Sequence, residues 1–350
     1  MNIYISFYLL FIILKMEETN INKNINYSLE LLRLILSFWV VAHHCYKYVY
    51  IFSKVTFHVP IFMIMSFYFY YKVLKTKNSI KIKKRFLRIL FPYIVWPILF
   101  FISNNIIFKL FGFSQYKRKL SLKDLLLQLI FGLNFHIVFY YQFILIILTI
   151  AFTIISLLFH KNFVFIFLIL LIIAYSFQYD YWNLYIFNQY SGVIKYSLGN
   201  ILELLPFSVT GIAICHLNII TKLKALKELS IFFSLVIIFM IVKFDIFVRI
   251  KGFWYPGILL NIGGICIFII FSLVSFQNKI LIFVLKIITK FTGGIYYLHL
   301  IIYNILKTKI DLLKKRTFNG ILIIYIINYI ICYVGNKISY KIKLLKLLFN

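Results

Sequence analysis

An arginine and a histidine lie within one strongly apolar stretch near the start of the chain. Arg33 and His44 are eleven residues apart, with no Asp, Glu, Lys or Arg between them. Eleven residues make about three helical turns, so both side chains project from one helix face, about 16 Å apart along the axis. Such groups are costly inside a membrane helix unless they line a polar cavity. A neutral imidazole in that cavity can act as a general base, which predicts a catalytic site. The alternative is structural: Arg33 pairs with Glu30, and the histidines bond to backbone carbonyls.

A second candidate site lies in the basic segment that follows the second apolar run. Arg85 and Arg88 are three residues apart, so they share one face where a helix enters the membrane. Two guanidinium forks at such a place suit the recognition of phosphate groups. The alternative is a cytoplasmic anchor that sets the topology and touches lipid phosphates.

Further polar residues in apolar surroundings are possible contacts for a substrate, although each has a structural alternative. These residues are Glu30, His43, His136, Glu203, Tyr296 and His299. We expect no metal site, because the chain has no HExxH motif and no close set of His and Cys. Neither a Walker loop nor a GxGxxG motif is present, so a nucleotide-binding fold has no support.

The elements that position these residues must be membrane helices. Of the 350 residues, 63% are hydrophobic and only 13% are charged, which excludes a water-soluble globule. The net charge of +29 comes from basic residues that fall between apolar runs. There they act as topology signals, so we do not expect a nucleic-acid partner. The four scattered cysteines are expected to be small buried hydrophobic residues.

Long apolar runs without alternation predict an all-α, polytopic transmembrane helix bundle without a soluble domain. We expect about ten spans of roughly 20 residues each. They lie near residues 31–51, 57–74, 87–108, 133–157, 162–179, 200–217, 229–248, 254–275, 287–306 and 318–337.

The chain is expected to divide into an N-terminal segment (1–28), a membrane domain (29–340) and a basic tail (341–350). In the first segment, either Met16 is the true start or residues 1–15 lie on the membrane surface. Eight basic residues between positions 72 and 88 predict a cytoplasmic loop. With ten spans, both termini are then cytoplasmic.

Five short motifs follow one another along the chain. They are ELLR at 30–33 with His44 beyond it, VPIFMIMSFY at 59–68, KRFLRILFPY at 84–93, HIVF at 136–139 and FTGGIYYLH at 291–299. In this order they resemble the acyltransferase-3 family of integral membrane acyltransferases. Phe67 stands where that family usually has glycine, and Val138 replaces a tryptophan.

The resemblance implies transfer of an acyl group, usually acetyl, from cytoplasmic acyl-CoA to a hydroxyl of an envelope carbohydrate or lipid-linked sugar. It implies no bound cofactor, a location in the inner or plasma membrane of a bacterial-type cell, Arg33 and His44 as the core pair, and Arg85 and Arg88 as ligands of the CoA phosphates. The alternative is a transporter of envelope glycans or their lipid-linked precursors that does no acyl-transfer chemistry. The acceptor, the acyl group and the oligomeric state stay open.

Overall fold

The structure, a computed structural model, describes residues 26–45, 57–76, 79–111, 120–132, 139–159, 166, 169–170, 193–250, 257–306, 318–339 and 346–349. All secondary-structure elements among these residues are helices, which confirms the all-α fold class. They are α2 (Tyr27–Cys45), α4 (His58–Lys75), α5 (Ser79–Phe111), α6 (Leu122–Phe131), α7 (Phe139–Leu158), α10 (Val193–His216), α11 (Ile219–Leu223), η2 (Lys224–Leu226), α12 (Lys227–Ile250), α13 (Gly257–Leu273), α14 (Lys279–Ile288), η3 (Thr289–Phe291), α15 (Thr292–Leu306), α17 (Phe318–Ile338) and α18 (Lys346–Phe349).

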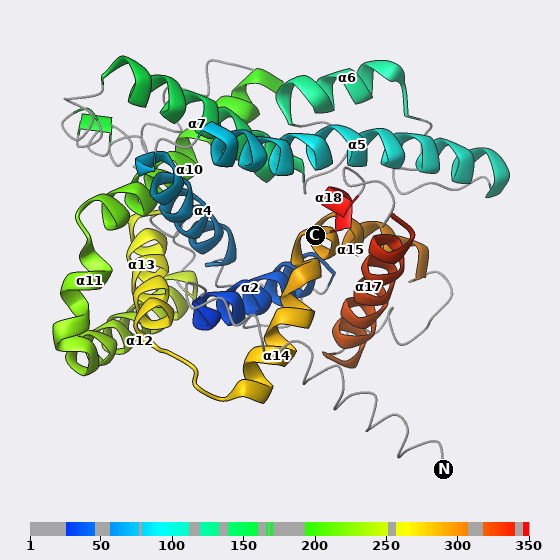
Figure 1. The fold of residues 1–350 in the computed structure, drawn as a ribbon. Helices are drawn as coiled ribbons and strands as arrows, with labels where there is room; N and C mark the ends of the chain where they lie inside the picture. Colours follow the sequence, from blue (N-terminus) through cyan, green and yellow to red (C-terminus); the bar gives the residue numbers. More distant parts are fainter. Residues whose placement is uncertain are drawn as a thin grey trace, which may run out of the picture.

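Helix α2 lies in the middle of the bundle (Figure 1). Helices α4 and α13 contact it on one side, and α14, α15 and α17 contact it on the other. Helices α5, α6 and α7 form a neighbouring group, and α10 packs against both α4 and α7. The helix that carries the Arg33 and His44 motif is therefore enclosed by other helices and not exposed along an edge.

Six stretches of the described helices are long and apolar enough to cross a membrane. They are Ile80–Ile106, Phe139–Leu158, Gly199–His216, Ile219–Lys243, Lys279–Tyr303 and Phe318–Ile338. The predicted number of about ten is thus not confirmed. The span expected at 162–179 lies almost entirely outside the described residues. The stretch expected at 254–275 contains a shorter apolar helix, Leu259–Leu273.

Two predicted boundaries are wrong for reasons that the local sequence explains. The basic residues at 81–88 form the first turns of α5 and not a loop, because α5 begins at Ser79. The separate helix α6 precedes the span predicted at 133–157. Ser121 and Asp124 form a capping box at its start. Its C-cap Gly132 has a φ of 70°, the left-handed conformation that favours glycine.

Glycines bring two helices close to α4. A Cβ at Gly211 of α10 would overlap the backbone carbonyl of Ile64, and one at Gly263 of α13 would lie 2.5 Å from the Phe57 ring. Small residues permit this close backbone approach in membrane bundles. As predicted, the free cysteines Cys215, Cys266 and Cys332 are buried. The site residues on α4 are thus held by tight packing on both of its flanks.

Candidate functional site

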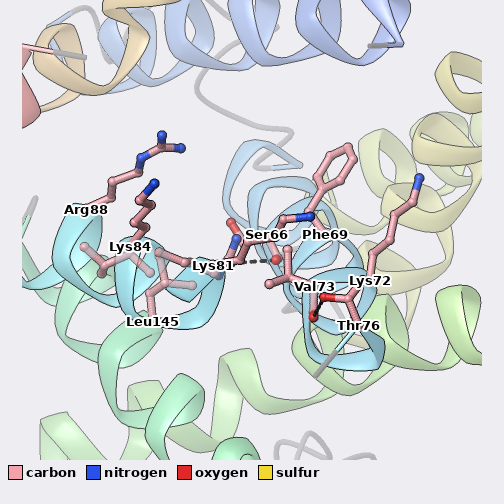
Figure 2. A pocket seen from close by; sticks show the side chains of 11 residues that line it. Ser66, Phe69, Lys72, Val73, Thr76, Lys81, Lys84, Arg88 and Leu145 are labelled. Atoms are coloured by element: carbon pink, nitrogen blue, oxygen red, sulfur yellow. Dashed lines mark hydrogen bonds between the residues drawn. The ribbon is translucent and has the colours of Figure 1, made fainter. Parts of the chain in front are cut away.

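A cleft with many basic side chains lies between the C-terminal half of α4 and the start of α5 (Figure 2). We call it the basic cleft. It encloses about 580 Å³ and is lined by Ser66, Phe69, Lys72, Val73, Thr76, Lys81, Lys84, Arg85, Arg88, Ile89 and Leu145. Figure 2 shows Lys84 and Arg88 rising together from one side and Lys72 from the other. Five basic side chains around one opening are an arrangement that suits an anion with several charges.

The two predicted arginines have different surroundings within the basic cleft. Arg85 is half-buried; its Nη2 donates to the Ser66 carbonyl over 2.7 Å, and its guanidinium lies 5.4 Å from the centre of the Tyr70 ring. Arg88, one helical turn further, is exposed. Arg85 therefore joins α5 to α4, whereas Arg88 presents its guanidinium to whatever enters the cleft.

A second hollow, which we call the histidine cavity, lies around the opposite end of α4. It encloses about 450 Å³, and its walls come from α2, α4, α7, α10, α13 and α15. The lining residues are Val40, His43, His44, His58, Val59, Pro60, Tyr140, Asn200, Glu203, Leu204, Phe207, Leu260 and Tyr296. The cavity thus gathers predicted residues from three regions of the chain, namely His43 and His44, Glu203, and Tyr296.

Imidazole rings form a row along this cavity. The His43 ring centre lies 5.1 Å from that of His58 and 5.2 Å from that of His44. The His44 ring centre is in turn 5.5 Å from that of His299, which is fully buried on α15. Three helices therefore place four imidazole rings beside one cavity.

Hydrogen bonds to backbone carbonyls orient the His299 ring. Its Nδ1 lies 2.7 Å from the Tyr296 carbonyl oxygen and 3.2 Å from that of Ile295. A carbonyl oxygen can only accept a hydrogen bond, so Nδ1 carries the proton. In the neutral ring, Nε2 is then an acceptor.

Arg33 shares its helix with His44 but has a separate set of contacts. Its Nε donates to Thr292 Oγ1 over 2.8 Å, and its Nη2 donates to the Thr289 carbonyl over 2.6 Å. The guanidinium also pairs with Glu30 at 3.4 Å. Neither Arg33 nor Glu30 is among the described residues that line the histidine cavity. Arg33 thus attaches α2 to the start of α15.

A polar and aromatic partition separates the two hollows. The Tyr141 hydroxyl lies 3.5 Å from the Ser66 hydroxyl, which faces the basic cleft. The Tyr141 ring centre lies 5.8 Å from that of Tyr296, which lines the histidine cavity, and 6.4 Å from that of Phe62. Tyr141 is buried. Because it contacts residues of both sites, it lies between them.

Sequence reasoning missed His58 and Tyr141. His58 is 3% exposed, and it directly precedes the VPIF segment that the motif comparison singled out. The signal in the sequence that could have identified His58 was its place directly before this motif. His136 was predicted but lies outside the described residues. Among the described residues, no group of three His, Cys, Asp or Glu side chains is placed to hold a metal ion.

Comparison with known proteins gives one match. A family model described as an acyltransferase domain, that of the acyltransferase-3 family, matches residues 26–337. No curated protein and no solved structure matches the chain. The matched segment contains both hollows and the partition between them.

Proposed function

Because the chain belongs to the acyltransferase-3 family, we propose that this membrane acyltransferase moves an acyl group, acetyl as in most of the family, from acyl-CoA to a hydroxyl of an envelope carbohydrate or lipid-linked glycan. The observation that carries the proposal is the pair of hollows at the two ends of α4, one lined by five cations and the other by histidines.

The basic cleft suits the phosphate-bearing part of acyl-CoA. Arg88, Lys81 and Lys84 are exposed on α5, and Lys72 is exposed on α4, so phosphates entering between the helices meet cations from both sides. The positive-inside rule places this end of α4 in the cytoplasm, where acyl-CoA is made. With the ten spans expected from the sequence, both termini would also be in the cytoplasm of a bacterial-type cell, and the start of α4 would face outward.

The histidine cavity suits the chemical step. In direct transfer, an acceptor hydroxyl gives its proton to a nitrogen of His44 while its oxygen attacks the thioester carbon. The carbon–sulfur bond breaks, and the departing thiolate takes the proton from His44 to give free CoA. In the alternative route, a nitrogen of neutral His44 attacks the thioester carbon, and the carbon–sulfur bond breaks to release the CoA thiolate. The acceptor hydroxyl then takes the acyl group from that nitrogen, and its proton goes to the thiolate to give free CoA. Glu203, His43 and Tyr296 line the same cavity and are our candidates for contacts with the acceptor.

Because the partition separates the two hollows, the acyl donor must pass it to reach His44. The pantetheine arm of the donor has to carry the thioester from the basic cleft past Tyr141 and Ser66 to His44. Arg33 acts at a distance from this path. Its bonds to Thr289 and Thr292 hold α15, and therefore Tyr296 and His299, against α2.

The direct test is to incubate the purified chain, reconstituted in lipid, with radiolabelled acetyl-CoA and an extract of envelope carbohydrate and lipid-linked sugar. We expect free CoA and labelled acceptor to appear together and to depend on His44. Movement of glycan across the bilayer without release of CoA would contradict the proposal and favour the transporter. Rapid-quench labelling distinguishes the two chemical routes, because only the acyl-enzyme route labels a histidine.

A further inference from the structure

We propose that His299 is a positioning residue for His44: its unprotonated Nε2 accepts a hydrogen bond from the His44 imidazole when a substrate is bound. The inference rests on the proposed function, because it assigns a partner to the residue that we place at the reacting atoms. It concerns a residue that lies behind the cavity wall and is not among the described residues that line it.

The hydrogen bonds of His299 define its tautomer. Backbone carbonyls of its own helix, those of Tyr296 and Ile295, hold the Nδ1 proton, so the neutral ring has its only lone pair on Nε2. His299 is fully buried, so no bulk water competes for that lone pair. A buried acceptor of this kind is costly unless a donor lies within reach.

The His44 ring lies beside that of His299. The two ring centres are 5.5 Å apart and the rings are inclined by only 33°. Imidazoles joined by one N–H···N bond have centres about 5 Å apart, because the bond spans about 3 Å and each nitrogen lies about 1 Å from its ring centre. A small rotation of either ring therefore completes the bond.

Two contacts along their length hold α2 and α15 in register. Arg33 binds Thr292 near the start of both helices, and His44 lies beside His299 further along. The two helices therefore run in the same direction. Thr292 and His299 are seven residues apart, about two turns, so both project from one face of α15. The Arg33 bonds thus fix the position of α15 along the axis of α2, and with it the position of His299 relative to His44.

The chemical consequence follows from the donor and acceptor roles. When His44 gives its N–H to His299, its other nitrogen carries the lone pair and can face the cavity as a base. After that nitrogen takes the acceptor's proton, His44 is a cation, and the neutral His299 acceptor stabilises it until the thiolate removes the proton. The other titratable side chains around His44 are His43 and His58 on one flank, with Glu203, Tyr140 and Tyr296 also on the cavity wall.

Two substitutions separate this role from a packing role. Asparagine at position 299 keeps a polar group near Nδ1 and loses Nε2, whereas glutamine reaches the place of Nε2. We expect His299→Gln to retain more than a tenth of the acetyl-transfer kcat. We expect His299→Asn to lose about 10- to 100-fold, as outer-shell partners do when they are removed. The donor KM should stay unchanged in both variants, because the basic cleft is untouched. The assay uses reconstituted protein, radiolabelled acetyl-CoA and envelope extract.

The proposal is overturned if His299→Asn is as active as His299→Gln or more so, because the backbone bond would then be what matters. A second measurement needs no active variant: the ¹⁵N spectrum of histidine-labelled wild-type protein, with the His299 signals assigned by their loss in His299→Asn. An unprotonated Nε2 is expected, and a protonated Nε2 in the neutral ring overturns the proposal. Failure of the proposed function is distinct, because it would show as no transfer by the wild-type chain.

Discussion

The two hollows at the ends of α4 differ in the kind of charge that they hold. The basic cleft carries lysines and arginines, whose side chains are cations. The histidine cavity carries imidazoles and one exposed carboxylate, that of Glu203, which can gain or lose protons during a reaction. Fixed cations suit recognition of an anion, and titratable rings suit proton transfer.

Under the proposed function, recognition of the donor and the chemical step are divided between the two ends of α4. Ser66 lines the basic cleft, while His58 and Pro60, two turns earlier on α4, line the histidine cavity. The Tyr141 partition keeps the two sets of side chains apart. If the division is real, substitutions on one side must change donor binding, and substitutions on the other must change turnover.

The largest effect is expected for His44→Ala. The loss of a general base should reduce acetyl transfer by about 10²- to 10⁴-fold without changing the donor concentration needed for half-maximal binding. The matched control is His216→Ala. His216 lies at the end of α10, where its Nδ1 bonds to the Tyr71 hydroxyl at 2.6 Å, outside both hollows. If His44→Ala retained acetyl transfer, the chemical step would not take place at His44 in the histidine cavity.

The next effect is expected for Arg88→Ala, which should raise the donor concentration for half-maximal rate about tenfold. Loss of one charged hydrogen bond costs about 1.5–3 kcal/mol, and 1.4 kcal/mol is a factor of ten. Arg88 is the sharper choice because Arg85 also bonds to Ser66. The control Lys83→Ala removes an exposed cation from the same helix that does not line the cleft. If the two substitutions had equal effects, the basic residues of the cleft would set the membrane topology and would not bind the donor.

A smaller effect is expected for Tyr141→Ala, which removes the partition that defines the comparison. Water should then reach the thioester more easily, so release of CoA without acylated product should rise about threefold. Tyr141→Phe keeps the ring contacts with Tyr296 and Phe62 and should behave like the wild type. The measurement is the ratio of free CoA to labelled acceptor. An unchanged ratio in Tyr141→Ala would show that Tyr141 does not separate the hollows.

The smallest effect on turnover is expected for Arg33→Ala. Its bonds to Thr289 and Thr292 should contribute about 1–3 kcal/mol to stability, so the thermal unfolding midpoint should fall. The thermal unfolding midpoint of Arg33→Lys should fall similarly, because an ammonium group cannot reproduce the guanidinium fork. A loss of turnover as large as that of His44→Ala, with an unchanged midpoint, would instead place Arg33 at the reacting atoms.

Parts of this arrangement could be predicted from the sequence because they depend on helical spacing. Arg85 and Arg88 are three residues apart, and the structure brings them into one cleft. Arg33 and His44 share the side of α2 that meets α15. Helical period alone fixes such relations.

Contacts between distant segments could not be predicted in this way. Nothing in the spacing shows that Arg33 bonds to Thr292, 259 residues away, or that His58 joins the row of imidazoles. These relations depend on how α2, α4 and α15 pack against one another, and the spacing of residues along a single helix does not determine that packing. The number of spans also depended on where polar residues interrupt apolar runs, as the separate helix α6 shows.

The division between the hollows is tested most directly by equilibrium binding of acetyl-CoA to the His44→Ala protein. Binding is measured in lipid nanodiscs beside the wild type and Arg88→Ala. We expect His44→Ala to bind acetyl-CoA as tightly as the wild type while transferring it about 10²- to 10⁴-fold more slowly, and Arg88→Ala to bind about tenfold more weakly. Loss of binding in His44→Ala, together with unchanged binding in Arg88→Ala, would contradict the account.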